Sequence, residues 1–145
     1  MTLALNYDGD VIAWANEQAR LLRTGQFAAL DIEHLAEEIE DVGKSEQREL
    51  ASRMAVLLAH LLKWQWQPAR RGRSWDATIR VQRASIAHRL QRTPSLRQSL
   101  ADPDWCQDAW NDALAKAIEE TGLSDFPLHC PWPMEKILDP DWKAE

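Results

Sequence analysis

The sequence predicts an all-α protein: a single-domain helical bundle of four to five main helices, with a short extra helix and a proline-rich C-terminal wrap. Apolar residues recur at three- and four-residue spacing, the period of an α-helix, and no stretch alternates as a strand does. Residues 31–49 carry eight carboxylates against two basic side chains, and residues 70–97 carry eight arginines against one aspartate. These oppositely charged segments flank the apolar run MAVLLAHLLKWQW, so we expect them to pack side by side against it.

Length and composition fit an ordinary globular protein. A chain of 145 residues predicts one domain and can bury a core without metal or disulfide support. The two cysteines, Cys106 and Cys130, form no CxxC motif, and a net charge of −6 does not favour nucleic acid or an anionic membrane. The N-terminus lacks signal-peptide features, and the longest apolar run is too short to cross a bilayer. We expect a cytoplasmic protein without a cofactor.

The first helix should begin after Asp8 or Asp10, either of which can cap it, and run to about Thr24. Gly25 then supplies the left-handed residue that commonly ends a helix. Gln18 falls within the apolar stripe of this helix, so a buried amide there would need a hydrogen-bond partner.

A second helix should begin at Asp31, whose carboxylate can accept the first free backbone amides. Gly43 interrupts the pattern and Ser45 can cap a new start, so we expect a break or kink there. The third helix should run from Glu46 to about Trp66, with an apolar arc wide enough to pack on more than one side. The inward stripe of the second helix is predicted to be Ile32, Leu35, Ile39 and Val42.

A fourth helix should begin at Ser74, whose hydroxyl can cap it. Cap-then-proline pairs predict a short helix after Pro94 and a longer one from Pro103 to about Thr121, which Gly122 ends. The tail contains four prolines and cannot be one helix, so it should wrap the bundle. Its predicted anchors are Phe126, Trp132 and Ile137.

Polar side chains at or within the predicted apolar faces form one candidate site. Glu38 and His60 flank the stripes of their helices, and Gln82 and Arg83 intrude on the stripe of the fourth. A buried arginine needs a carboxylate, so we expect Arg83 to pair with Glu38, with His60 nearby. This cluster either fixes helix register or serves an enzyme, with Glu38 or His60 as the acid–base and Arg83 as an anion clamp. Further predicted members are His34, Gln82, Trp64 and Trp75.

A metal site is a second hypothesis. His34 stands three and four residues before Glu37 and Glu38, so either pair could share an ion. No second copy of this arrangement exists, and there is no HExxH motif. A solvated acidic helix face with an exposed histidine explains the pattern better, so no metal is predicted.

The arginine-rich segment is a third candidate site. Arginines interleaved with tryptophans can hold phosphates and stack bases. The acidic segment of the same chain can neutralise them, so nucleic-acid binding is unlikely on this interpretation, and a protein-partner surface fits better. There is no GxSxG motif and no glycine-rich phosphate loop. The arginines are Arg70, Arg71, Arg73, Arg80, Arg83, Arg89, Arg92 and Arg97.

Several motifs resemble one bacterial family, catalogued as domain of unknown function twenty-nine. They are EHLAEEIE, HLLKW at His60–Trp64, SW at Ser74–Trp75 and QR at Gln82–Arg83, followed by TPSLRQSL, ETGL and FPLHCPW. The likeness runs from about Tyr7 to Asp139, and His34 stands where the family often has asparagine. The resemblance implies a compact helical bundle of unassigned biochemistry and supplies no catalytic residues.

The function predicted from these observations is a helical binding or interaction domain. Its partner would be an unknown protein or a second copy, meeting through the tryptophan-rich ends. The alternative is a small hydrolase- or transferase-type enzyme using Glu38, His60 and Arg83.

Overall fold

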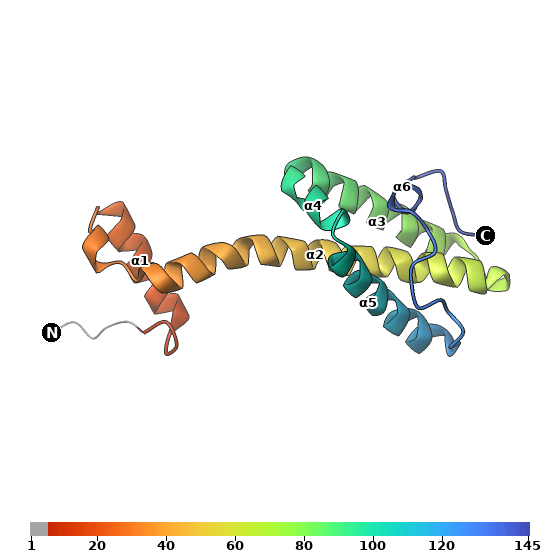
Figure 1. The fold of residues 1–145 in the computed structure, drawn as a ribbon, viewed down its shortest axis with the longest axis horizontal. Coiled ribbons are helices and arrows are strands. Elements are labelled where there is room, and N and C mark those ends of the chain that lie inside the picture. Colours follow the sequence, from red (N-terminus) through yellow and green to blue (C-terminus); the bar gives the residue numbers. More distant parts are fainter. Residues whose placement is uncertain (1–5) are drawn as a thin grey trace. The chain divides into compact units, whose positions relative to one another are not determined.

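Every regular element among residues 6–145, the part of the chain that the computed structural model describes, is helical (Figure 1). The all-α prediction is therefore confirmed. The α-helices are α1 (Val11–Arg23), α2 (Ile32–Trp66), α3 (Arg73–Arg92), α4 (Arg97–Leu100), α5 (Pro103–Thr121) and α6 (Met134–Ile137), with 3₁₀ turns at Phe27–Ala29, Pro68–Arg70 and Pro94–Leu96.

The chain forms two compact units. The first unit is Met1–Ser45 and the second is Glu46–Glu145. Helix α2 begins in the first unit and ends in the second. Each unit is described separately below.

The predicted helix ends follow from their capping residues. Of the two candidate aspartates, Asp10 caps α1, because its Oδ1 accepts a hydrogen bond from the Ala13 amide at 3.0 Å. Asp102 caps α5 in the same way. Gly25 and Gly122 both have φ of +73°, the left-handed conformation that glycine adopts without strain. These boundaries are confirmed.

Gln18 has the partner that its position requires. Its side chain is buried in the first unit, and its Oε1 accepts a hydrogen bond from the Asp31 backbone amide at 2.8 Å. The bond satisfies a buried amide and ties α1 to the start of α2.

The predicted break at Gly43 is wrong. Helix α2 continues through Gly43 and Ser45 without interruption. Glycine lowers helix stability by roughly 1 kcal/mol relative to alanine but keeps its backbone N–H, so it weakens the hydrogen-bond ladder without ending it. Ser45 consequently has no cap to supply.

The predicted inward stripe of residues 32–42 is also wrong. The exposed fractions of Ile32, Ile39 and Val42 are 70%, 71% and 67%, and Leu35 is half-buried. Every residue from Ile39 to Arg48 is exposed. The periodicity correctly identified one helix face, but no described residue of the first unit covers that face.

Helix α3 begins one residue earlier than predicted. It starts at Arg73, and its N-cap is Gly72, which has no side chain to offer. Ser74 lies inside the helix and does not cap it. The serine hydroxyl therefore does not satisfy the free backbone N–H groups of the first helical turn.

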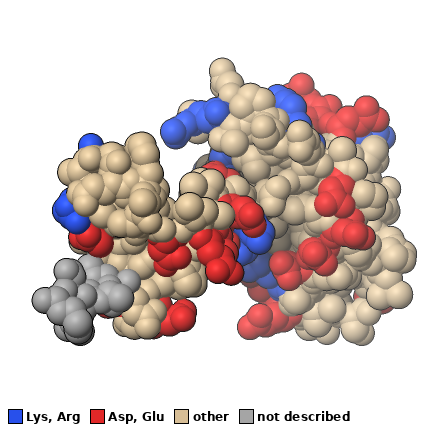
Figure 2. All heavy atoms as spheres, turned by 60° about the vertical axis from the view of Figure 1, so that its left-hand side comes forward, with Lys and Arg blue, Asp and Glu red and all other residues tan. Residues whose placement is uncertain are grey.

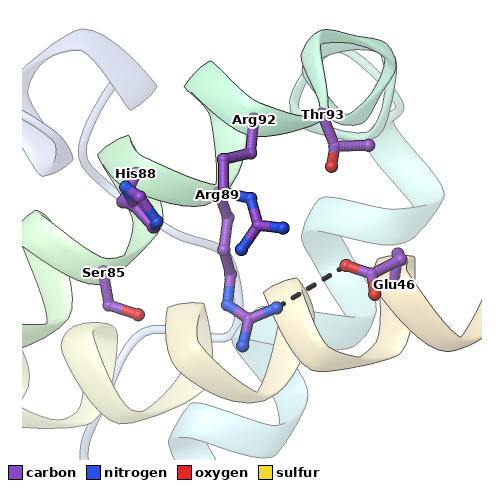
Figure 3. Close-up of a pocket in the computed structure, with 6 residues that line it drawn as sticks. All are labelled: Glu46, Ser85, His88, Arg89, Arg92 and Thr93. Carbon is purple, nitrogen blue, oxygen red and sulfur yellow. Dashed lines mark ion pairs between the residues drawn. The ribbon is translucent and has the colours of Figure 1, made fainter.

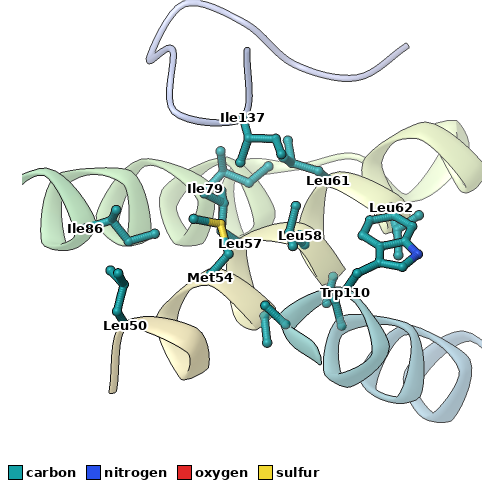
Figure 4. Packing of buried hydrophobic residues seen from close by; sticks show 14 of the residues in the cluster. Leu50, Met54, Leu57, Leu58, Leu61, Leu62, Ile79, Ile86, Trp110 and Ile137 are labelled. Atoms are coloured by element: carbon teal, nitrogen blue, oxygen red, sulfur yellow. The ribbon is translucent and has the colours of Figure 1, made fainter. Parts of the chain in front are cut away.

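The core of the second unit is built on the apolar half of α2. Figure 4 shows its side chains meeting those of α3, α5 and α6. Small residues on α5 (Ala109, Ala113 and Ala117) are fully buried, so the helix packs closely. The large residues that expose less than 2% of their surface are Leu50, Met54, Leu57, Leu61, Leu62, Ile79, Ile86 and Trp110.

The proline-rich tail packs on this core as predicted. Phe126 and Ile137 are buried, and Trp132 packs edge-on against Trp110 with ring centroids 5.7 Å apart. One short helix, α6, forms within the tail. Near the C-terminus, Lys143 pairs with the Asp76 carboxylate and so holds the end of the tail against α3.

Candidate functional site

His34 and Glu38 lie in a small aromatic cluster of the first unit. Tyr7 stacks on His34 with ring centroids 4.2 Å apart, and its hydroxyl donates to the Glu38 carboxylate. His34 Nδ1 lies 2.7 Å from Asp31 Oδ2, which also accepts from Trp14 Nε1 at 2.9 Å. His34 and Glu38 therefore share Tyr7 as a neighbour, and His34 also pairs with Asp31.

Hydrogen bonding in this cluster shifts three protonation equilibria. The bond to Glu38 raises the pKa of Tyr7 to about 12, because it stabilises the neutral phenol beside a carboxylate. The His34–Asp31 hydrogen bond raises the pKa of His34 and lowers that of Asp31. The pair is thus an ion pair at mildly acidic pH.

His60 belongs to a cluster in the second unit that includes two residues absent from the prediction. Its Nδ1 lies 2.9 Å from the Val56 carbonyl, and its Nε2 lies 3.5 Å from Lys63 Nζ. Lys63 is only 7% exposed and pairs with Glu120 at 2.5 Å. Burial lowers the pKa of His60, so its ring favours the neutral form.

The sequence contained a signal for Lys63. It is the single charged residue within a run that is otherwise apolar on several sides, and a lysine there must be buried or snorkel. Glu120 gave no comparable signal, because it is one of several carboxylates near the end of α5.

Arg83 is buried, with 6% of its surface exposed. Its Nε donates to the Ile137 carbonyl at 2.8 Å, and its Nη2 is enclosed without a hydrogen-bond partner among residues 6–145. Burial lowers its pKa, and the charge of Asp139 opposes that effect. Gln82 is half-buried with its Oε1 similarly unpartnered.

The predicted cluster is therefore brought together only in part. His60 and Arg83 share no hydrogen-bond or ion-pair partner in the described chain. Glu38 belongs to the first unit and these two belong to the second, so its pairing with Arg83 stays a prediction.

The predicted tryptophans contact cations of the second unit. Lys63 Nζ lies 5.3 Å from the ring centroid of Trp75, and Lys143 Nζ lies 4.4 Å from that of Trp64. Both distances are within the range of cation–π attraction. All eight tryptophans are buried or half-buried, so their rings are used mainly inside the units.

The arginine-rich helix α3 forms one wall of a polar cavity of about 230 Å³ (Figure 3). Arg89 reaches across it to Glu46 at 3.6 Å and to Glu49 at 3.4 Å, as acidic and basic segments were expected to do. Figure 3 shows Arg92 and His88 beside this bridge. The cavity is lined by Glu46, Ser85, His88, Arg89, Arg92 and Thr93.

Charge is unevenly distributed along the chain. Residues 1–45 carry nine carboxylates and three basic side chains, whereas residues 46–145 carry fourteen of each. The first unit therefore holds the whole net charge of −6. Figure 2 shows basic side chains lying among acidic ones on the face that it presents.

Residues 6–145 contain neither a metal-binding cluster nor a membrane-spanning helix. No group of three or more His, Cys, Asp or Glu side chains there is arranged to hold a metal ion. No helix in that range combines the length and hydropathy needed to cross a bilayer.

Fold and contacts together define an all-α protein whose polar clusters are mostly paired internally. Its sequence matches the family model described as a domain of unknown function, DUF29, over residues 6–143. The chain belongs to this family. No curated protein and no solved structure matches it.

Proposed function

We propose that this chain is a protein-interaction module that pairs with a second copy of itself through one exposed strip of α2. The strip consists of Ile32, Leu35, Ile39 and Val42. The observation that carries the proposal is the 67–71% exposure of its three β-branched members. Burying such a side chain is worth about 1.5–3 kcal/mol, so an uncovered row of them favours association.

The spacing of the strip suits a two-stranded coiled coil. Its members occupy positions a and d of two successive heptads, with Ile32 and Ile39 at a and with Leu35 and Val42 at d. β-Branched residues at a, combined with leucine at d, favour two strands. A second copy presents the same strip and so satisfies it by two-fold symmetry.

Four of the five acidic residues between Ile32 and Val42 lie away from this seam, and the fifth, Glu38, occupies a flanking g position. In the same frame Glu33, Glu37, Glu40 and Asp41 occupy the outer positions b, f, b and c. The flanking e positions are Ala36 and Gly43, whose small size lets two helices approach.

The exposed segment also benefits from a partner. A helical segment without packing partners is only marginally stable in water, because most helical stability in proteins comes from tertiary packing. Residues 39–45 are such a segment. Pairing across the strip would stabilise it directly.

Sedimentation velocity over a concentration series tests the proposal. The unmodified chain should dimerise reversibly, and Ile39→Asp should weaken the dimer at least about tenfold, since each copy loses a buried isoleucine. Ile12→Asp is the matched control, because Ile12 is 73% exposed in the same unit but lies on α1. A chain that remains monomeric throughout, or equal losses in both variants, would contradict self-pairing.

Salt dependence separates this pairing from a charge-driven one. Two first units together carry −12, so screening should strengthen the dimer between about 0.05 M and about 0.5 M salt. Association with a basic partner surface would weaken over the same range.

A further inference from the structure

A second cavity of the second unit differs in character from the polar one. Its volume is about 210 Å³, and it lies where α3 approaches the C-terminal tail. Its wall combines apolar residues with two arginines. The lining residues are Arg83, Ile86, Ala87, Leu90, Arg97 and Leu138.

Arg83 carries a buried charge that is only partly compensated. It is 94% withdrawn from solvent, yet no carboxylate in residues 6–145 lies within ion-pair distance of it. Among residues 6–145, the Ile137 carbonyl is an acceptor for the guanidinium Nε, and Nη2 has none. The negative charge of Asp139 acts on Arg83 from beyond ion-pair distance and compensates the buried cation only in part, so an anion bound beside the guanidinium would be favoured.

Arg97 provides the second positive group. It is exposed and lies on the short helix α4, and it forms no ion pair within the described chain. Two guanidiniums can hold one carboxylate, because each offers parallel donors that match its two oxygens. Ile86, Leu90 and Leu138 offer no polar side-chain group, so they suit an apolar body.

We propose that this cavity binds a small organic carboxylate, with its charged group between Arg83 and Arg97 and its apolar body against Leu90 and Leu138. An apolar cavity of roughly 150 Å³ accommodates benzene, so about 210 Å³ has room for an aromatic ring bearing a carboxylate. A nucleotide is too large for this volume. The site is independent of the exposed strip of α2.

Benzoate is a suitable probe, with benzyl alcohol as its neutral counterpart and inorganic phosphate as a charged group without an apolar body. Titrations of the full chain, followed by backbone amide NMR, should show saturable shifts at Ala87, Leu90 and Leu138 with benzoate. Benzyl alcohol should bind at least about tenfold more weakly, because it cannot use charge-assisted hydrogen bonds.

Variants at the cavity test the role of each arginine. Arg97→Gln removes an exposed group and should weaken benzoate binding about tenfold or more without affecting the fold. Arg92→Gln is the matched control, because Arg92 is an exposed arginine that lines the other cavity. Arg83→Met keeps the volume and removes the charge; it should abolish the preference for benzoate over benzyl alcohol.

Each outcome of these titrations either supports or contradicts the proposed carboxylate site. Binding of benzoate that depends on Arg97 and not on Arg92 supports the site. Phosphate binding as tightly as benzoate would overturn the organic part of the proposal. Shifts that do not saturate, or that are equal in both glutamine variants, would overturn the site itself. None of these results depends on whether the chain dimerises.

Discussion

At the scale of single residues, hydrogen bonding decides which charges are fixed and which remain responsive to pH. His34 and Asp31 form the clearest responsive pair, with side chains about one-third exposed. The histidine pKa is raised above its ordinary value of 6.5 and the aspartate pKa is lowered below 3.8. A pair of this kind stabilises the folded first unit only where both members are charged.

The pair predicts how stability depends on pH. The contribution of His34 is fully present below pH 6.5 and is lost as pH rises through its raised folded-state pKa. That of Asp31 is present above pH 3.8 and is lost as pH falls through its lowered one. His34→Gln should therefore destabilise the chain more at about pH 6 than at about pH 9, as measured by urea unfolding at both values. NMR titration of the His34 ring supplies the control, since Asp31→Asn should lower its pKa; an unchanged pKa in that variant would show that the carboxylate is not the cause.

At the scale of elements, Gly43 offers a direct test of the continuity of α2. The glycine is helical, and a Cβ added there would meet nothing within 4 Å. Gly43→Ala should therefore stabilise the chain by about 0.5–1 kcal/mol, because alanine loses less backbone freedom on folding. Gly122→Ala is the contrasting variant: its φ is +73°, so the same change should destabilise. Thermal unfolding of both measures the difference, and a destabilised Gly43→Ala chain would indicate a bend that the alanine opposes.

The same elements show which structural features can be predicted from sequence patterns. Caps and left-handed glycines are local, so Asp10, Asp102 and Gly122 were predictable from neighbouring residues alone. Periodicity identified the face of residues 32–42 but not what would cover it, because burial depends on where other elements pack. The break at Gly43 failed for another reason: propensity is a weak preference that a long helix overrides.

The candidate site was harder to predict than the fold. Burial of Arg83 followed from its place within an apolar stripe, and the structure agrees. The acceptor of the Arg83 hydrogen bond is the Ile137 carbonyl. A backbone acceptor in a distant segment cannot be predicted from a sequence pattern. Lys63, which lies beside His60, likewise pairs with Glu120, 57 residues away in the sequence. Long-range pairing of this kind depends on tertiary packing and not on spacing.

At the scale of the whole molecule, stability is distributed unevenly along α2. Its apolar half lies in the core of the second unit, where Leu57 and Leu61 are fully buried. Every residue from Ile39 to Ser45 is exposed, and Glu40 and Asp41 lie in this stretch. One helix thus joins a segment held by packing to a segment held by its own hydrogen bonds.

Amide hydrogen exchange should reveal this division. Amides near Leu57 and Leu61 should exchange only through openings close to global unfolding, whereas those of residues 39–45 should exchange orders of magnitude faster through local opening. Raising the protein concentration should then slow exchange at Ile39 and Val42 if two copies pair through their strip, because a coiled-coil partner would oppose that opening. Ile39→Asp measured in parallel should remove the concentration dependence while leaving the amides near Leu57 unchanged. Equal protection along the whole of α2 in dilute solution would mean that the exposed half is stabilised by contacts within a single chain, and the case for a partner on its apolar strip would be lost.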